Sequence, residues 1–194
     1  MTKPLSRRGL IAGLGALPLL AHPAILRAQV TPMTDRPTDT GALRNISAFT
    51  RRNWQDHFPS LGVGAIVCDV DSRAVHYWNP DGSYYVYPSS VPLSEDLTKR
   101  GYTEVVRKKE GPTWTPTASM RERDPSLPQS VGPGPDNPLG THAMYLGWPA
   151  YLIHGTHDTR KIGRPSSSGC FGLYNEQVAQ LYPMVDIGTQ VRVM

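Results

Sequence analysis

Cys170 is the residue of this sequence best suited to nucleophilic chemistry. It follows Pro165–Gly169, a run of small residues that lets the backbone fold tightly and exposes an adjacent thiol. A nucleophilic cysteine needs a lowered pKa, an open approach and nearby N–H groups for the oxyanion, and a Gly–Cys turn before a helix can meet these needs. The alternative is a structural cysteine, either buried or in a disulfide with Cys68. Cys68 lies among apolar residues, which favours an inert core thiol.

His154 is the candidate base for this thiol. It ends the short apolar run Tyr151–His154, sixteen positions before Cys170. Cysteine and histidine partners are adjacent in space and not in sequence, so the spacing alone establishes no contact. A neutral histidine satisfied within the core remains the alternative.

Other chemistries find less support in the sequence. A zinc site would use His142, His154 and His157 with Asp158, but neither HExxH nor paired CxxC is present. The GxSxG motif of a serine hydrolase is also missing. The basic run 107–109 lies between two glutamates, which favours a solvated strand face over a nucleic-acid patch.

The elements that must position these residues are mostly strands. Proline and glycine contribute 19 and 18 of the 194 residues, which favours short strands and turns over long helices. Asn79–Gly82 predicts a hairpin turn, because proline presets φ and glycine accepts a positive φ. A brief helix is expected to be capped by Asn175 and closed by Pro183. Strands are expected at 61–70, 74–78, 83–87, 104–109, 151–154 and 190–193, and 125–138 is expected to form a loop.

The charge distribution divides the chain. Overall, 20 Lys and Arg against 16 Asp and Glu give a net charge of +4, but residues 1–28 carry four of the bases and none of the acids. Paired Arg7-Arg8, an uncharged stretch from Gly9 to Leu26 and a small residue at Ala28 are typical of a secretory signal of the twin-arginine kind. A membrane anchor is the alternative, but the stretch is marginal in length and interrupted by prolines. Without the signal the charges balance, which removes the argument for a nucleic-acid partner.

These observations predict three segments: a signal peptide at 1–28, a leader or tether at 29–59 and a catalytic domain at 60–194. We expect the mature chain in the periplasm, reached by the twin-arginine route and with no stable membrane anchor after cleavage.

Several motifs together resemble one family. They are Tyr151–Thr156 (YLIHGT), Ser167–Phe171 (SSGCF), Asn175 and Gly188–Val193 (GTQVRV). In this combination they resemble the L,D-transpeptidases with a YkuD-type catalytic domain, over about residues 60–194. The resemblance implies a mainly β, sandwich-like fold, with one short helix after the cysteine.

The resemblance also implies roles. Cys170 would be the nucleophile and His154 its base, with the Gly155 backbone orienting the histidine and the N–H groups of Gly169 and Cys170 facing the oxyanion. The substrate would be the tetrapeptide stem of peptidoglycan, carbapenem-like β-lactams would inhibit, and neither a cofactor nor a metal would be used. Residues expected in the substrate groove are Trp114, Tyr145, Ser167, Ser168 and Asn175.

Two positions depart from the family pattern. Ser168 stands where many relatives have histidine, and Gly172 stands where many have arginine or asparagine. The second change removes a polar group that could bind a stem carboxylate. Besides transfer to a second stem, the sequence leaves open hydrolysis, attachment of a protein amine to the wall, and a non-enzymatic wall-binding module with an inert Cys170.

Overall fold

The computed structural model describes residues 51–194, so the predicted signal peptide and most of the predicted tether lie outside the described residues. The described residues all belong to one compact unit of the chain, which spans residues 40–194. Within them, no helix is long and apolar enough to cross a membrane.

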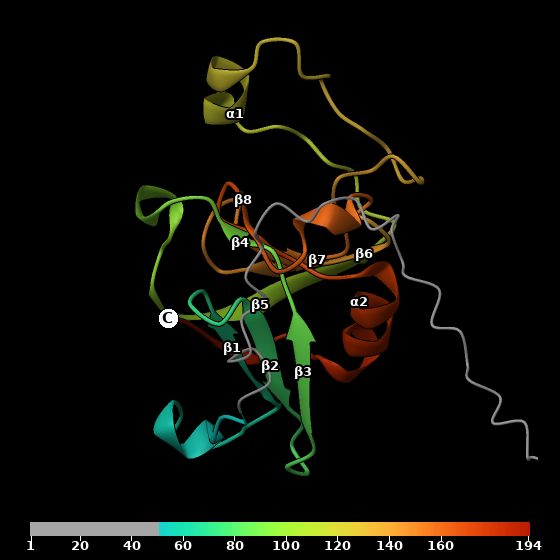
Figure 1. The fold of residues 1–194 in the computed structure, drawn as a ribbon. Coiled ribbons are helices and arrows are strands. Elements are labelled where there is room, and N and C mark those ends of the chain that lie inside the picture. Colours follow the sequence, from blue (N-terminus) through green and yellow to red (C-terminus); the bar gives the residue numbers. More distant parts are fainter. Residues whose placement is uncertain (1–50) are drawn as a thin grey trace, which may run out of the picture. The chain divides into compact units, whose positions relative to one another are not determined.

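Most strands form one curled eight-stranded sheet in the order β3-β2-β1-β10-β5-β6-β7-β9 (Figure 1). Neighbours are antiparallel except for β1 with β10 and β7 with β9, which are parallel. A small second sheet pairs β4 with β8. The expected mainly β fold is confirmed. The strands are β1 Ala65–Asp69, β2 Ala74–Trp78, β3 Tyr84–Pro88, β4 Val91–Pro92, β5 Gly101–Glu110, β6 His142–Leu146, β7 Leu152–His154, β8 Pro165–Ser167, β9 Phe171–Gly172 and β10 Gln190–Val193.

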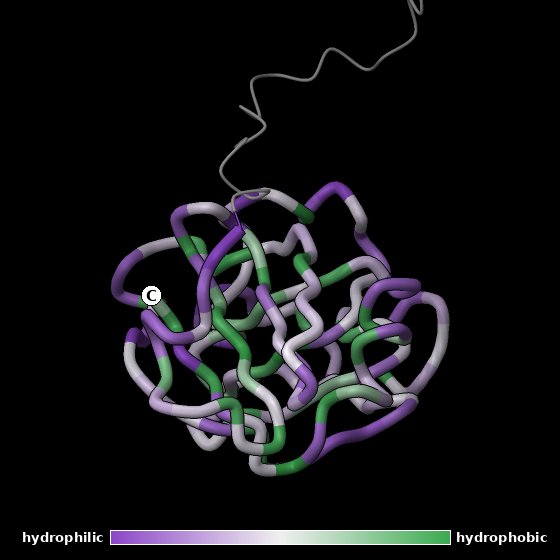
Figure 2. The backbone as a smooth tube through the Cα atoms, turned by 90° about the horizontal axis from the view of Figure 1, so that it is seen from below, coloured by the Kyte–Doolittle hydropathy of each residue, from purple (hydrophilic) through white to green (hydrophobic). Residues whose placement is uncertain are grey.

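The main core lies between one face of this sheet and helix α2, Asn175–Leu181. Successive strand residues point to opposite faces, so alternate apolar positions such as Ile66 and Cys68 face the core together. Val178 and Leu181, one turn apart on α2, are fully buried against them. Figure 2 shows hydrophilic residues mainly in the outer loops of the trace and hydrophobic stretches mainly inside it.

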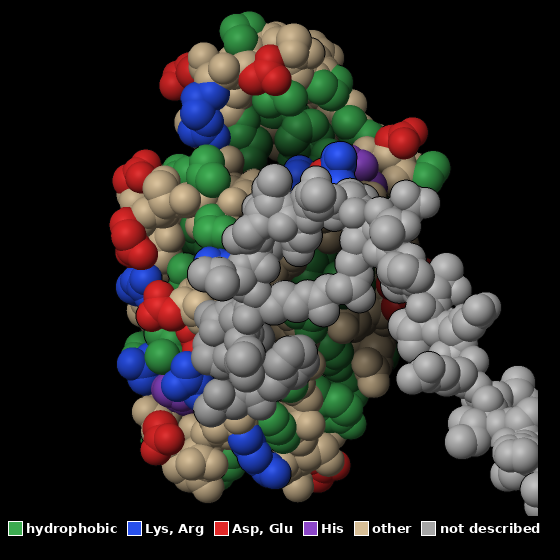
Figure 3. Space-filling model, viewed as in Figure 1, with side chains coloured by type: hydrophobic (Ala, Val, Ile, Leu, Met, Phe, Trp, Pro, Cys, Tyr) green, Lys and Arg blue, Asp and Glu red, His purple; other side chains and the backbone are tan. Residues whose placement is uncertain are grey.

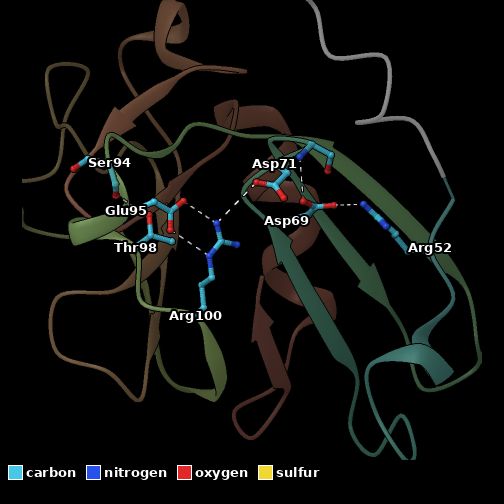
Figure 4. Close-up of polar contacts among 8 residues, drawn as sticks. Arg52, Asp69, Asp71, Ser94, Glu95, Thr98 and Arg100 are labelled. Atoms are coloured by element: carbon cyan, nitrogen blue, oxygen red, sulfur yellow. Dashed lines mark hydrogen bonds and ion pairs between the residues drawn. The ribbon is translucent and has the colours of Figure 1, made fainter.

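The opposite face of β1 and β2 is covered by residues just upstream. Phe58 is only 4% exposed and packs against Trp78, and Trp54 of a short 3-10 helix, Trp54–Asp56, contacts the same cluster. Arg52 pairs with the buried Asp69 (Figure 4). The packed chain therefore begins before residue 60, where the sequence placed the start of the domain.

A second group of charges lies nearby on the surface. Arg100 pairs with Glu95 at 2.9 Å and with Asp71 at 3.9 Å, and so links the 3-10 helix Glu95–Leu97 to the turn after β1 (Figure 4). Both carboxylates are well exposed, so these pairs contribute little to stability.

The structure differs from the expected elements in several places. Strand β5 is longer than expected, and β4, β6, β8 and β9 were not anticipated. Helix α1, Ala118–Arg123, forms in the segment between β5 and β6, where Thr117 caps it by accepting from the Met120 N–H. Helix α2 forms where expected, but its N-cap is Tyr174 and not Asn175.

Candidate active site

Strands β7 and β9 bring His154 and Cys170 together. They are parallel, with Ile153 opposite Phe171 and His154 opposite Gly172. Ile153 and Phe171 point into the main core. By the two-residue period, the side chains of His154 and Cys170 both point to the opposite face. There they line one cavity of about 200 Å³.

Cys170 sits in an environment that disfavours its thiolate. Its side chain is partly buried and Sγ donates to the Ala150 carbonyl at 3.3 Å. Burial raises the pKa of the Cys170 thiol to about 11, although a hydrogen bond from the Leu152 backbone opposes the shift. The sequence-based expectation of a lowered pKa is therefore wrong for the free protein. The thiol is neutral at pH 7 and needs a base to react.

His154 has the properties of such a base. Its Nδ1 is hydrogen-bonded to the Gly155 carbonyl. A carbonyl only accepts, so Nδ1 carries the proton and Nε2 keeps its lone pair. Burial lowers the pKa of His154 to about 4; the Gly155 carbonyl opposes this and the charge of Lys161 adds to it. The imidazole is thus neutral at pH 7, with one nitrogen free to accept a proton.

The turn before Cys170 is tightly held. Gly169 has φ +126, and a Cβ there would lie 3.1 Å from the ring of Tyr151. The Ser167 hydroxyl donates to the Cys170 carbonyl at 2.6 Å and accepts from the Gly169 N–H at 3.3 Å. The Gly169 N–H expected to face the oxyanion is therefore bonded to Ser167 in this structure.

Asn175 lies behind His154 and does not line the cavity that His154 and Cys170 share. Its Oδ1 accepts from the Thr141 N–H at 3.2 Å. A Cβ at Gly140 or Gly155 would lie only 2.1 or 2.3 Å from that oxygen. The amide of Asn175 thus occupies space that two glycines leave open, and it supports the backbone whose carbonyl orients His154.

A larger cavity of about 560 Å³ opens on the other side of Cys170. Trp114 and Tyr145 line it, and the guanidinium of Arg107 stacks on the Tyr145 ring, 3.5 Å from its centroid. Arg107 and Tyr145 are opposite each other on β5 and β6. A planar cation on an aromatic ring gives this cavity both an apolar wall and a fixed positive charge.

The wall that carries Trp114 is the segment 111–141, which connects β5 to β6 and includes α1. The Gly111 N–H donates to the Thr141 carbonyl at its base, and Trp114 pairs with Val131 further out. The buried amide of Asn137 donates to the Pro112 carbonyl at 2.6 Å. Figure 3 shows hydrophobic side chains where the part of the molecule carrying α1, at the top, meets the body below.

The smaller cavity has a mixed lining. Ser167, Ser168 and Lys161 line it together with apolar residues such as Leu139, and Trp114 lines both cavities. The Ser168 hydroxyl accepts a hydrogen bond from Arg123 of α1 at 3.0 Å. Ser168 therefore links the segment 111–141 to the turn that carries the nucleophile.

The absence of a side chain at position 172 is explained by the neighbouring Ser90. The Ser90 hydroxyl accepts from the Gly172 N–H at 3.0 Å, and the Ser90 N–H donates to the Gly172 carbonyl at 2.8 Å. A Cβ on Gly172 would lie 2.6 Å from that hydroxyl oxygen. Ser90 thus fills the space that a side chain at 172 would need.

Ser90, Lys161 and Arg107 are among the lining residues that were not found from the sequence. Ser90 and Lys161 lie in segments that carry no motif, and Arg107 was interpreted as part of a solvated strand face. Only the pairing of β5 with β6 places Arg107 on Tyr145, so no signal within the run 107–109 would have identified it.

The alternative sites can also be located. Cys68 is fully buried in β1, and both cysteines are free thiols, so no disulfide joins them in this structure. Within residues 51–194, no three His, Cys, Asp or Glu side chains gather as a metal site would require.

Comparison with known proteins identifies the family. Residues 64–193 match the L,D-transpeptidase catalytic domain of the YkuD type. The chain belongs to this family. A relative from Fuscovulum blasticum that carries the L,D-transpeptidase name is 56% identical over the full length of both chains. The L,D-transpeptidase ErfK/SrfK of Escherichia coli is 39% identical over a matched region that covers 66% of this chain and 43% of that relative.

Solved structures support the fold of this L,D-transpeptidase domain. An L,D-transpeptidase from Mycobacterium smegmatis superposes with a TM-score of 0.55 at 21% identity, covering 68% of this chain and 58% of the other. L,D-transpeptidase 3 from Mycobacterium tuberculosis, in complex with a faropenem-derived adduct, gives a TM-score of 0.54 at 18% identity, covering 68% and 60%.

Proposed function

We propose that this L,D-transpeptidase acts on peptidoglycan stems through an acyl-enzyme on Cys170. The observation that carries the proposal is the cavity that His154 and Cys170 line together, with the Nε2 lone pair of His154 left free by the Nδ1 bond to Gly155. The family membership supplies the reaction class, and this geometry supports Cys170 as the nucleophile and His154 as the base.

In the first half-reaction, Nε2 of His154 takes the thiol proton as Sγ of Cys170 attacks the carbonyl of the third stem residue. The tetrahedral intermediate collapses, the C–N bond to the terminal D-Ala breaks, and His154 returns the proton to the leaving amine. A thioester on Cys170 remains. The neutral resting pair fits this order of events, because proton transfer accompanies attack.

In the second half-reaction, the amine of another stem attacks the thioester carbonyl. His154 accepts a proton from that amine, the C–S bond breaks, and the thiol is restored. The product is a cross-link between two third-position residues. Water as the acceptor would give carboxypeptidase activity by the same steps, and a protein amine would give attachment to the wall.

We further propose that the larger cavity holds the donor stem. Its aromatic wall of Trp114 and Tyr145 suits the apolar parts of a peptide, and Arg107 suits a stem carboxylate. The same opening would admit a carbapenem-like β-lactam, since related L,D-transpeptidases carry imipenem and a faropenem-derived adduct in their structures. We also propose that the enzyme acts in the periplasm, a location that the twin-arginine-like signal of residues 1–28 supports.

The test is product analysis with purified disaccharide tetrapeptide. We expect the wild-type protein to release D-Ala and form a cross-linked dimer detected by mass spectrometry. Cys170→Ala abolishes both products, and His154→Asn, whose amide can still donate to the Gly155 carbonyl, reduces them at least a hundredfold, within the range that general base catalysis contributes.

Cys68→Ala is the matched control, because Cys68 is the other thiol and lies in the core. It should keep the covalent carbapenem adduct that Cys170→Ala loses. Wild-type cross-linking by Cys170→Ala would overturn the proposal. If the wild-type protein converts the disaccharide tetrapeptide only to the tripeptide form, without a dimer, the reaction is hydrolysis and not transfer.

A further inference from the structure

The lining of the smaller cavity carries a positive charge and no negative one. Apart from His154 and Cys170, its polar lining residues are hydroxyl side chains and the cation Lys161, and no aspartate or glutamate is among the lining residues. One of the hydroxyls, that of Ser90, accepts from the Gly172 N–H and keeps its own proton to donate. The lining therefore offers one positive charge and hydrogen-bond donors, which suits an anion.

Lys161 is available to such an anion. It ends the 3-10 helix Thr159–Lys161, which Asp158 caps. The Asp158 carboxylate is held by the Arg160 guanidinium at 2.8 and 3.0 Å, and no ion pair to Lys161 is formed in the part of the chain that the structure describes. The charge of Lys161 reaches the site, since it helps to lower the pKa of His154.

The covalent structure of the substrate brings an anion to this place. In the proposed reaction, the leaving amine takes its proton from His154, so the leaving residue must lie on the His154 side of Cys170. The carboxylate carbon of a terminal D-Ala is three bonds from the scissile carbonyl carbon and within about 4 Å of it. With that carbonyl at Sγ of Cys170, the carboxylate falls in the cavity that contains His154 and Lys161.

We infer that the smaller cavity binds the carboxylate of the residue that follows the scissile bond, with Lys161 as its counter-charge. This inference rests on the proposed function and adds a specificity-determining residue to it. Ser90 leaves no room for a side chain at position 172, so the positive charge of this cavity comes from the segment after β7. An acceptor amine with a carboxylate on the same carbon would occupy the same place in the second half-reaction.

Two tetrapeptide stems test the inference, one ending in D-Ala and one in D-alaninamide. The measurement is kcat/KM for release of the last residue, by mass spectrometry. We expect the wild-type enzyme to prefer the carboxylate by about tenfold to hundredfold, the range for a hydrogen bond to a charged group. Lys161→Met brings the ratio of the two kcat/KM values close to one, whatever its effect on each value, and Lys161→Arg keeps the preference.

Lys109→Met is the matched control for the change in net charge, because Lys109 is exposed on β5 and lines neither cavity. Dissociation constants of both stems for Cys170→Ala, with and without Lys161→Met, give a second readout without turnover. A preference that survives Lys161→Met, or a wild-type enzyme that treats both stems alike, would overturn the inference and leave the proposed function standing. Failure of wild type and Cys170→Ala to process or bind either stem would overturn both.

Discussion

Replacing Gly172 by alanine should destabilise the domain through one defined contact. The added Cβ would lie 2.6 Å from the Ser90 hydroxyl oxygen but 3.8 Å from the Ser90 Cβ, an ordinary contact distance. The hydroxyl cannot simply rotate away, because it accepts the Gly172 N–H. The conflict is therefore with one atom, and Ser90→Ala removes that atom.

The magnitude follows from the two ways the conflict can be relieved. If Ser90 stays in place, overpacking costs about 1–3 kcal/mol. If the hydroxyl rotates away, the buried N–H of residue 172 loses its partner, which also costs about 1–3 kcal/mol. Ser90→Ala alone leaves the same N–H unsatisfied, at a similar cost. The double variant has only the unsatisfied N–H, so it should be about 1–3 kcal/mol more stable than the sum of the single changes predicts.

Equilibrium unfolding in urea at pH 7 measures all four proteins of this cycle. Each kcal/mol should also lower Tm by roughly 2–4 °C for a domain of this size. A Gly172→Ala protein as stable as wild type would refute the reasoning, and so would single effects that add within about 0.5 kcal/mol in the double variant. The rate of carbapenem adduct formation is a second readout, because the added Cβ would lie 3.6 Å from Cε1 of His154.

Three further predictions follow from the buried groups of the site. Asn175→Leu removes the acceptor of the Thr141 N–H, so it should lower the free energy of unfolding by about 1–3 kcal/mol and slow acylation. Asn175→Asp keeps an acceptor oxygen and should lose less stability. Equal losses for the two variants in urea titrations would contradict this role. Burial lowers the pKa of both His76 and His154 to about 4, so between pH 6.5 and 4 the unfolded state binds more protons than the folded state. As the pH is lowered through this window, the free energy of unfolding should decrease by about 3 kcal/mol for each histidine. A Tm that stays constant from pH 7 to 4.5 would disprove this. The raised pKa of Cys170, about 11, predicts an iodoacetamide alkylation rate that increases roughly tenfold per pH unit from pH 7 to 10; a plateau by pH 8 would mean that a thiolate already exists there.

Slow alkylation at neutral pH would not make Cys170 an inert structural thiol. The sequence left open a non-enzymatic wall-binding module with an inert Cys170, and slow alkylation alone would not establish it. In this structure the thiol is neutral because it is buried, and His154, which lines the same cavity, is neutral as well. Thiol reactivity and catalytic competence are therefore separate measurements, and only loss of product on Cys170→Ala decides the role.

Local patterns predicted the elements that depend on nearby residues. Strand β2 has the bounds 74–78 that the sequence predicted, and Asn79–Gly82 turns the chain into β3 as its proline and glycine predict. Strand β9 has two residues and depends on pairing with β7, so no periodicity could show it. Helix α1 ends just before the predicted loop 125–138, in a segment for which the sequence predicted no element, and the Thr117 cap is its clearest local signal.

The residues of the site likewise include some that local sequence predicted and others that it missed. Cys170 and His154 were found because their types and flanking residues carry the chemistry. Lys161 and Ser90 were missed because their place depends on how loops far apart in sequence close over β7 and β9. Asn175 was expected in the groove, and only the close approach of two glycine backbones shows its contact behind His154.

The segment 111–141 has a consequence for how new specificities can arise. Its two ends meet in a backbone hydrogen bond between Gly111 and Thr141, directly beside the pairing of Glu110 with His142. Its length can therefore change with little effect on the entropy of closing the chain. The reacting pair lies outside this segment, so variation here would reshape the walls that Trp114 gives both cavities without replacing the nucleophile or the base. Lineages that meet different wall polymers could exchange this hairpin loop alone.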